Sequence, residues 1–367
     1  MEIPFFNYSD LFKQNKNELI KIFEDVGNRG AFILQKDLLE FEQELSKFTG
    51  ANYAVGVGNA TDGLQLALTA GNIEKDSEII ISSHTMIATA GAIHHVGCKP
   101  IPVEAGPDLL IDYSNIESAI TSNTKAIMPT HLNGRTCDMD KIISIAKKYD
   151  LEIYEDAAQG LGSSFRGKSA GTFGVASAIS FYPAKNLGSL GDAGAILTND
   201  IEIYEKLMML RDHGRNPKNG DISCWGVNSR LDNLQAAFLK YMLKDYEKII
   251  KRRRQIALIY DNELSSIAQI KLPPPPNQGN HFDVFQNYEI QADKRDELKD
   301  YLYYKGIGTL IQWSGKAIHQ FTSLGFNQKC PNTDKLFNRI LMVPLNMFIT
   351  DEQVLTVCKS IKEFYSY

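Results

Sequence analysis

The chain has 367 residues, of which 43% are hydrophobic and 23% are charged, and its formal net charge is −5. This ordinary balance shows neither a nucleic-acid-binding nor a membrane-binding surface. The length exceeds that of a usual single domain, so we expect one large α/β domain and a smaller one.

The cysteines and the N-terminus bear on the cellular compartment. The five cysteines are odd in number, widely spaced and without a C-x-x-C pair, so neither a disulfide framework nor a metal site is indicated. The N-terminus lacks a basic region followed by an apolar stretch, and no run of about eighteen apolar residues occurs elsewhere. We therefore expect an unexported, cytoplasmic protein.

Apolar spacing in the first half of the chain predicts strands that alternate with helices. Amphipathic helices are expected at residues 10–27 and 38–48. Strands are expected at 53–57, 78–82, 100–104, 125–130 and 151–155, with helices at 87–95, 113–120 and 139–149. This alternation predicts a mainly parallel sheet that is covered on both faces and carries its ligand site at the carboxyl ends of the strands.

The turn Gly58-Asn-Ala-Thr-Asp-Gly63 follows the first strand of that sheet. Backbone N–H groups at a helix start, with small residues that allow close approach, can form an anion site. Taken alone, such a turn is more often a plain helix cap.

A lysine and an aspartate each follow an apolar run near the middle of the chain, Asp156 in Tyr154-Glu-Asp-Ala-Ala-Gln159 and Lys185 in Ser180-Phe-Tyr-Pro-Ala-Lys-Asn186. A desolvated amine can be tuned toward neutrality and attack an aldehyde. A carboxylate against a pyridine nitrogen keeps that nitrogen protonated, so the ring can draw electrons from a carbanion. Separately, Lys185 could be a surface residue of a hairpin and Asp156 a helix cap; together they indicate pyridoxal phosphate (PLP).

The second half of the chain predicts a linker helix and a smaller domain. A helix at 201–211 precedes a polar loop at 213–221, and a long helix begins near Leu234. We interpret the basic run Lys251–Arg254 within it as a solvated face. Beyond a rigid connection at Pro273–Pro276, we expect a strand at 283–290 and helices at 295–305 and 354–365. The predicted domains are 1–245 and, as a smaller α+β unit, 246–367.

These motifs resemble the DegT/DnrJ/EryC1/StrS family of sugar aminotransferases, whose pattern is E-D-A-A-Q/H followed by S-F-x-x-x-K-N. The resemblance runs from about Ala31 to the C-terminus. It implies an aspartate-aminotransferase-like fold (PLP fold type I) and PLP as cofactor, with pyridoxamine phosphate as the half-reaction form. It also implies that Lys185 is the nucleophile, that Asp156 holds the ring nitrogen and that Gln159 binds the ring hydroxyl side.

The resemblance extends to further cofactor contacts. In the family, residues at the positions of Ala60, Thr61 and Ser180 hold the cofactor phosphate. Met86 stands where an aromatic residue usually stacks on the ring. The motif Gly226-Val-Asn228-Ser-Arg-Leu-Asp is also similar to the family, and there the asparagine reaches the phosphate of the partner subunit's cofactor. A homodimer with shared active sites is therefore implied.

The resemblance also implies the substrates, which are L-glutamate as donor and a nucleotide-linked keto-deoxysugar as acceptor. The chain looks like an enzyme that aminates carbon 3 of a dTDP-3-keto-6-deoxyhexose in surface-polysaccharide (lipopolysaccharide O-antigen) or amino-sugar biosynthesis. Tyr182, Gln312, Trp313 and His319 are the candidate sugar contacts. Gln312 and Trp313 replace a His-Tyr pair that is common in the family, and Trp313 is equally a candidate core residue.

Other functions stay open at this point. Amination at carbon 4 of a UDP- or GDP-linked sugar would use most of the same motifs, and a non-catalytic member would retain the fold. Related dehydratases have histidine at the position of Lys185, which argues against that chemistry here. A nucleotide-binding dehydrogenase would need a G-x-G-x-x-G turn, of which Gly56-Val-Gly58 supplies only the first two glycines.

Overall fold

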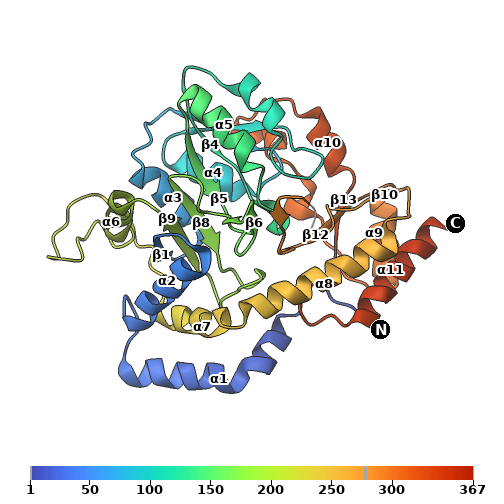
Figure 1. The fold of residues 1–367 in the computed structure, drawn as a ribbon, viewed down its shortest axis with the longest axis horizontal. Helices are drawn as coiled ribbons and strands as arrows, with labels where there is room; N and C mark the ends of the chain where they lie inside the picture. The colour runs from blue at the N-terminus through green and yellow to red at the C-terminus, as the bar shows by residue number, and fades with distance from the viewer. Residues whose placement is uncertain (1, 277–278, 367) are drawn as a thin grey trace.

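A seven-stranded sheet forms the centre of the computed structural model, which describes residues 2–276 and 279–366. Its strand order is β1-β9-β8-β5-β4-β2-β3 (Figure 1). The strands are β1 (Tyr53–Val57), β2 (Glu78–Ser82), β3 (Lys99–Val103), β4 (Thr124–Met128), β5 (Glu152–Asp156), β8 (Ala176–Ser180) and β9 (Gly194–Thr198). β9 pairs antiparallel with β1 and β8, and the other neighbours pair in parallel. The predicted α/β class with a mainly parallel sheet is confirmed.

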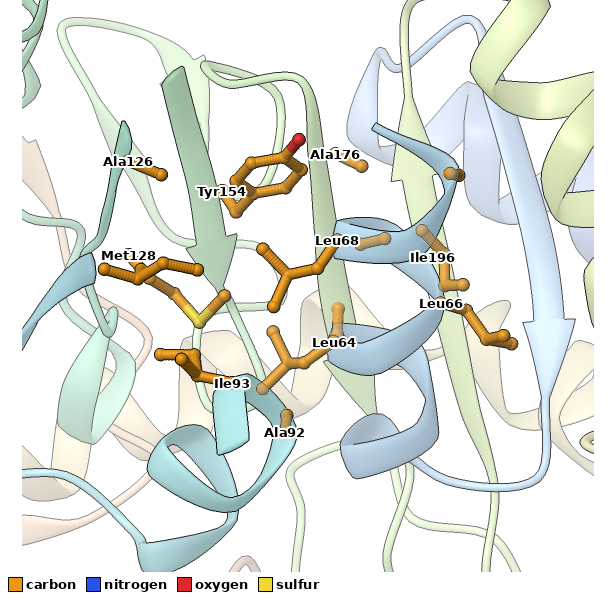
Figure 2. Close-up of a cluster of buried hydrophobic side chains, with 14 of the residues drawn as sticks. Leu64, Leu66, Leu68, Ala92, Ile93, Ala126, Met128, Tyr154, Ala176 and Ile196 are labelled. Atoms are coloured by element: carbon orange, nitrogen blue, oxygen red, sulfur yellow. The ribbon is translucent and has the colours of Figure 1, made fainter. Parts of the chain in front are cut away.

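Both faces of this sheet are buried, which explains its continuous apolar runs. Side chains alternate along each strand, so Ile196 of β9 packs in one core while its neighbours Ala195 and Leu197 pack in another. Helices α3 (Ala60–Ala70), α4 (Ile87–His95) and α6 (Ile201–Leu210) cover the first face. Figure 2 shows Leu64 and Leu68 of α3 packed beside Tyr154 of β5. Helices α2 (Lys36–Thr49), α5 (Met139–Tyr149) and α7 (Asn233–Leu243) contribute to the cores of the opposite face.

A separate apolar core surrounds a small antiparallel sheet of β10 (Ile270–Lys271), β12 (Tyr288–Ala292) and β13 (Ile340–Val343). Helices α8 (Tyr246–Leu264), α9 (Arg295–Tyr304) and α11 (Asp351–Tyr365) pack on it. A third sheet, which is also small, contains β6 (Ser164–Phe165), β7 (Lys168–Ser169) and β11 (His281–Phe282). Helix α1 (Tyr8–Arg29) lies beside α7 in Figure 1, and α10 spans Pro331–Phe337. None of the described helices is long and apolar enough to span a membrane.

Helix α8 contributes to two cores. Tyr246 and Ile250 pack in the core of the large sheet, whereas Ile256, Tyr260 and Leu264 pack in the core of the small sheet. The domain boundary at residue 245 stays a prediction. The expected long helix is divided there, because α7 ends at Leu243 and α8 begins at Tyr246.

Two local predictions were wrong, and one holds in part. The stretch 113–120, expected to be helical, forms two short 3-10 helices, at Tyr113–Asn115 and Glu117–Ala119, and no α-helix. The strand expected from residue 283 begins only at Tyr288. The basic run in α8 is not a uniformly solvated face, because the Arg253 side chain is buried and donates hydrogen bonds to the carbonyl oxygens of residues 285 and 286. Those carbonyls are therefore directed at α8, away from strand pairing.

Candidate active site

Lys185 and Asp156 lie at the carboxyl ends of two neighbouring strands. Asp156 ends β5, which pairs with β8 so that Asp156 is opposite Ala178. Lys185 lies in the connection between β8 and β9, which form the predicted hairpin. Burial lowers the pKa of the Lys185 amine, and Asp156 is close enough for its negative charge to raise that pKa in part. Two residues that are 29 positions apart in the sequence are thus brought to one place.

The Lys185 amine is tuned toward neutrality. Burial lowers the pKa of Lys185 to about 8, and the negative charge of Asp156 partly opposes this change. An ordinary lysine has a pKa of about 10.4. At pH 7 roughly one amine in ten is therefore neutral and able to act as a nucleophile or base.

This shift predicts selective chemical labelling of Lys185. In cofactor-free protein, an amine-specific acylating reagent should modify Lys185 with a rate that is half-maximal near pH 8. The lysine of a short unstructured peptide, added to the same sample, should show its midpoint near pH 10.4. Peptide mass spectrometry after short reaction times measures both sites in one sample. Equal midpoints for the two lysines would contradict the assigned shift.

The Asp156 carboxylate is oriented by two donors. Its Oδ2 accepts a hydrogen bond from the Thr89 hydroxyl at 2.6 Å, and its Oδ1 accepts one from the Ala158 N–H at 3.1 Å. Thr89 is buried on α4 and is connected through Thr85 to Thr130, with 2.8 Å between successive hydroxyl oxygens. The sequence did not point to Thr89, because a threonine in an apolar helix shows no pattern that predicts its contact with Asp156 at the end of β5.

The predicted phosphate residues gather at the N-terminus of α3. Asn59 caps the helix by accepting from the Asp62 N–H at 2.9 Å, which leaves the N–H groups of Ala60 and Thr61 outside the hydrogen bonds of the helix itself. Gly194 packs directly on this turn, since a Cβ there would lie 2.8 Å from the nitrogen of Ala60. Ser180 is the pairing partner of Gly194 on β8, so its hydroxyl lies at the same edge of the sheet.

The other predicted cofactor residues surround the same strand ends. The Gln159 Oε1 accepts from the Asn133 N–H at 2.7 Å, which fixes the amide on the turn after β4. Met86 immediately precedes α4, and its side chain is half exposed. Asn228 is exposed, and its neighbour Ser229 donates to the Asp62 carboxylate at 2.7 Å. The reach of Asn228 to a partner subunit stays a prediction.

The four candidate sugar contacts differ in exposure. Tyr182 is half exposed and lies near Tyr8. Burial raises the pKa of the Tyr8 phenol, and the proximity of Tyr182 raises it further. His319 is buried, with its Nδ1 2.6 Å from the Ser83 hydroxyl and its Nε2 2.9 Å from the Asp334 carboxylate. Trp313 is half-buried and packs against apolar side chains of two cores. The role of each in sugar binding stays a prediction.

Gln312 belongs to a buried polar cluster with His84, Asn133 and Glu289. The Gln312 amide donates to the Asn133 Oδ1 at 2.6 Å and to the Glu289 Oε2 at 3.0 Å. His84 is fully buried, and its Nε2 lies 3.7 Å from the Glu289 Oε2. Burial raises the pKa of Glu289 to about 8 and lowers the pKa of His84 to about 4, so both groups are largely neutral at pH 7.

The raised pKa of Glu289 predicts a pH-dependent stability. The folded chain holds a proton that an unfolded glutamate releases above about pH 4.3. This stabilisation is complete below that pH and is lost as the pH rises through about 8. Glu289→Gln cannot ionise, so its Tm should exceed that of the wild type by about 5 °C at pH 8 and by little at pH 5.

Glu104→Gln is the matched control for that measurement. The buried Glu104 carboxylate accepts from the N–H groups of Asn332 and Thr333 and from the Thr333 hydroxyl. Its replacement should lower the Tm at both pH values, since an amide cannot accept all three bonds. A Tm difference between Glu289→Gln and the wild type that is the same at pH 5 and pH 8 would exclude the raised pKa.

Glu155 explains why a second acidic residue precedes Asp156. Side chains alternate along β5, so Glu155 points to the opposite face and accepts from His131 at 2.8 Å. It also accepts from backbone N–H groups of the loop that leads into β8, at Gly171, Phe173 and Gly174. The carboxylate thus holds the loop before the lysine-bearing hairpin.

Known proteins of similar sequence and structure can be compared with this site. The model of the DegT/DnrJ/EryC1/StrS aminotransferase family matches residues 13–362. The chain is 35% identical to the pleiotropic regulatory protein of Geobacillus stearothermophilus, over 100% of both chains. It is 36% identical to the dTDP-3-amino-3,6-dideoxy-alpha-D-galactopyranose transaminase of Aneurinibacillus thermoaerophilus, over 99% of each chain. The crystal structure of S. venezuelae DesV in complex with a ketimine intermediate has a TM-score of 0.95 and 33% identity, covering 100% of this chain and 99% of that one.

The family match covers nearly the whole chain and includes every strand of the central sheet. It includes the strand end at Asp156, the hairpin that carries Lys185 and the segment around Asn228. The resemblance on which the fold, the cofactor and the enzyme class were predicted is thereby confirmed. The chain belongs to the DegT/DnrJ/EryC1/StrS aminotransferase family and is a PLP-dependent aminotransferase.

Proposed function

We propose that the chain transfers the amino group of L-glutamate to carbon 3 of a dTDP-linked 3-keto-6-deoxyhexose. The observation that carries the amino-transfer part of this proposal is the juxtaposition of a lysine amine of pKa about 8 with the Asp156 carboxylate, near the carboxyl ends of two paired strands. An anion-binding helix start lies at the same edge of the sheet.

The residues of this site fit PLP. The cofactor has an aldehyde, a pyridine nitrogen and a phosphate, and the site offers Lys185, Asp156 and the N-terminus of α3 to these three groups. Gly194 leaves no side chain over the helix start, where a Cβ would meet the backbone of residues 59 and 60. When bound, PLP would act as an electron sink that stabilises negative charge at the carbon undergoing amination.

Lys185 supports two tasks in this reaction. As a neutral amine it would hold the cofactor between turnovers, and as a free base it would remove a proton from the donor carbon and return one to the acceptor. A pKa near 8 suits both directions of proton transfer at neutral pH, because neither protonation state is strongly disfavoured. Asp156 would hold the protonated ring nitrogen, and the bonds from Thr89 and Ala158 orient its carboxylate for this role.

The remaining predicted residues would complete the site. Ala60, Thr61 and Ser180 would bind the phosphate through N–H and hydroxyl groups, and Gln159 would lie beside the ring. Met86 would contact the ring face with a thioether in place of an aromatic ring. Tyr182 is the exposed candidate for the sugar nucleotide. Asn228 would serve the site of a second copy, which makes the active form a homodimer.

Similarity supports the sugar assignment. The chain resembles transaminases whose names specify dTDP-linked 3-amino sugars, and others whose names specify UDP-linked ones. A nucleotide-linked keto sugar is common to both groups. Carbon 3 and the dTDP carrier are the finer part of the proposal.

The proposal is tested with the protein loaded with PLP. Adding L-glutamate should replace the visible absorption band with that of pyridoxamine phosphate. A panel of dTDP-, UDP- and GDP-linked 3-keto and 4-keto sugars should then restore the visible band fastest with the dTDP-linked 3-keto-6-deoxyhexose. Faster turnover of a UDP-linked or 4-keto sugar would overturn the sugar assignment, and a protein that stays colourless with PLP would overturn the site.

Sedimentation of the loaded protein at about twice the 41.1 kDa chain mass tests the dimer.

A further inference from the structure

The side chain of Gln286 makes hydrogen bonds on both sides of Lys185. Its Nε2 donates to the carbonyl oxygen of Ala184 at 2.9 Å, and its Oε1 accepts from the N–H of Asn186 at 2.8 Å. A backbone carbonyl only accepts and a backbone N–H only donates, so these partners fix the orientation of the amide. Gln286 is 6% exposed, so little water competes for either bond.

Gln286 is itself held by the neighbouring helix. Arg253 of α8 donates from its Nη2 to the carbonyl oxygen of Gln286 at 2.7 Å and from its Nε to that of Phe285 at 2.8 Å. The Asn186 side chain returns a bond to the carbonyl oxygen of Val284 at 3.3 Å. The segment 284–286 is therefore fixed between α8 and the lysine-bearing loop. This arrangement connects two regions that are 100 residues apart in the sequence.

We propose that Gln286 is a positioning residue, which fixes the main chain before and after Lys185 and thereby directs its amine at the substrate carbon. The inference rests on the role of Lys185 in the proposed function. A lysine amine stands at the end of a flexible four-carbon stem, so a small rotation of the backbone moves it far. Misplacement of a reacting group by about 1 Å can cost about 100-fold in rate.

The lysine loop offers a matched control at its other end. Gln235 of α7 accepts from the N–H of Leu190 at 2.9 Å, in the same loop but five residues beyond Lys185. Gln286→Met removes both bonds beside the lysine at nearly constant length, and Gln235→Met removes the bond at the far end. Gln286→Asn keeps a neutral amide on a side chain one methylene shorter, so it can reach at most one of the two partners and should show an intermediate effect.

The experiment uses loaded full-length protein for kinetics and cofactor-free protein for lysine labelling. Gln286→Met should lower kcat by about 10- to 100-fold with little change in KM for the sugar. The pH midpoint of Lys185 acylation should move by about one unit toward that of an exposed lysine. Gln235→Met should leave both the rate and the midpoint near those of the wild type.

The outcomes separate the inference from the proposed function. Borohydride reduction of loaded wild-type protein should attach the cofactor to Lys185, and attachment elsewhere would overturn the proposed function. Suppose that the cofactor is attached to Lys185 in the wild type. If Gln286→Met then has the same kcat and the same acylation midpoint as the wild type, only the role of Gln286 is overturned. An equal loss in Gln235→Met would overturn it as well, because general loosening of the loop would then suffice. If Gln286→Met does not fold, Gln286→Asn decides by the same two measurements.

Discussion

Lys185→Ala should lower kcat for amino transfer by about 10⁴-fold. General base catalysis alone contributes up to roughly that factor, and this variant also loses the group that would hold the cofactor. The side chain is partly buried in the connection between β8 and β9, where bulk water is a poor substitute for a positioned amine. Single-turnover absorbance after mixing loaded variant with glutamate measures the step directly.

Two controls support the assignment of that loss. Lys99→Ala removes an exposed lysine and should leave kcat unchanged. Millimolar methylamine should partly restore the rate of Lys185→Ala, because a small free amine can enter the space of the missing stem and accept the proton. Full activity of the alanine variant would exclude Lys185 as nucleophile and base.

Asp156→Asn should lower kcat by about 10²- to 10³-fold while the protein stays folded. The amide has nearly the shape of the carboxylate, and Thr89 can still donate to its oxygen, but the negative charge opposite the ring nitrogen is lost. The expected effect exceeds that of a lost neutral hydrogen bond, since the charge acts in a buried site.

A cofactor analogue distinguishes this electrostatic role from a structural one. PLP methylated on the ring nitrogen is positively charged whatever residue faces it, so it should raise the activity of Asp156→Asn relative to ordinary PLP. The same analogue should not improve the wild-type enzyme. If Asp156→Asn with ordinary PLP turned over at the wild-type rate, the carboxylate would have no part in activating the ring.

The order of elements and the strand-end residues were predictable, because they depend on local patterns. The β/α alternation predicts that Asp156 and the turn at Ala60 lie at the carboxyl ends of strands in one sheet. The hairpin that carries Lys185 follows from two apolar runs around a glycine-rich turn. In each case the pattern and the element that it predicts lie within a few residues of each other.

The contacts that support the site could not be predicted, because they join residues that are far apart in the sequence. Thr89, Asn133 and Gln286 act through partners that are 26 to 102 residues away in the sequence, and a polar side chain carries no periodic sign of such a partner. Arg253 was predicted to be exposed because a charged side chain is usually solvated. It is buried because it donates to backbone carbonyl oxygens of a segment that lies 32 residues later in the sequence. The surroundings of the buried His84 also depend on a distant partner, since its Nε2 lies 3.7 Å from the Oε2 of Glu289 in the small sheet.

Helix α8 has a thermodynamic consequence, because one continuous helix contributes side chains to a core of the large sheet and to the core of the small sheet. Tyr246 at its start and Tyr260 near its end are each fully buried, one in either core. If either core unfolded, α8 would lose packing contacts there, and the helix would then be less stable where it packs in the other core. Scanning calorimetry should accordingly record a single endotherm whose van't Hoff enthalpy approaches the calorimetric one.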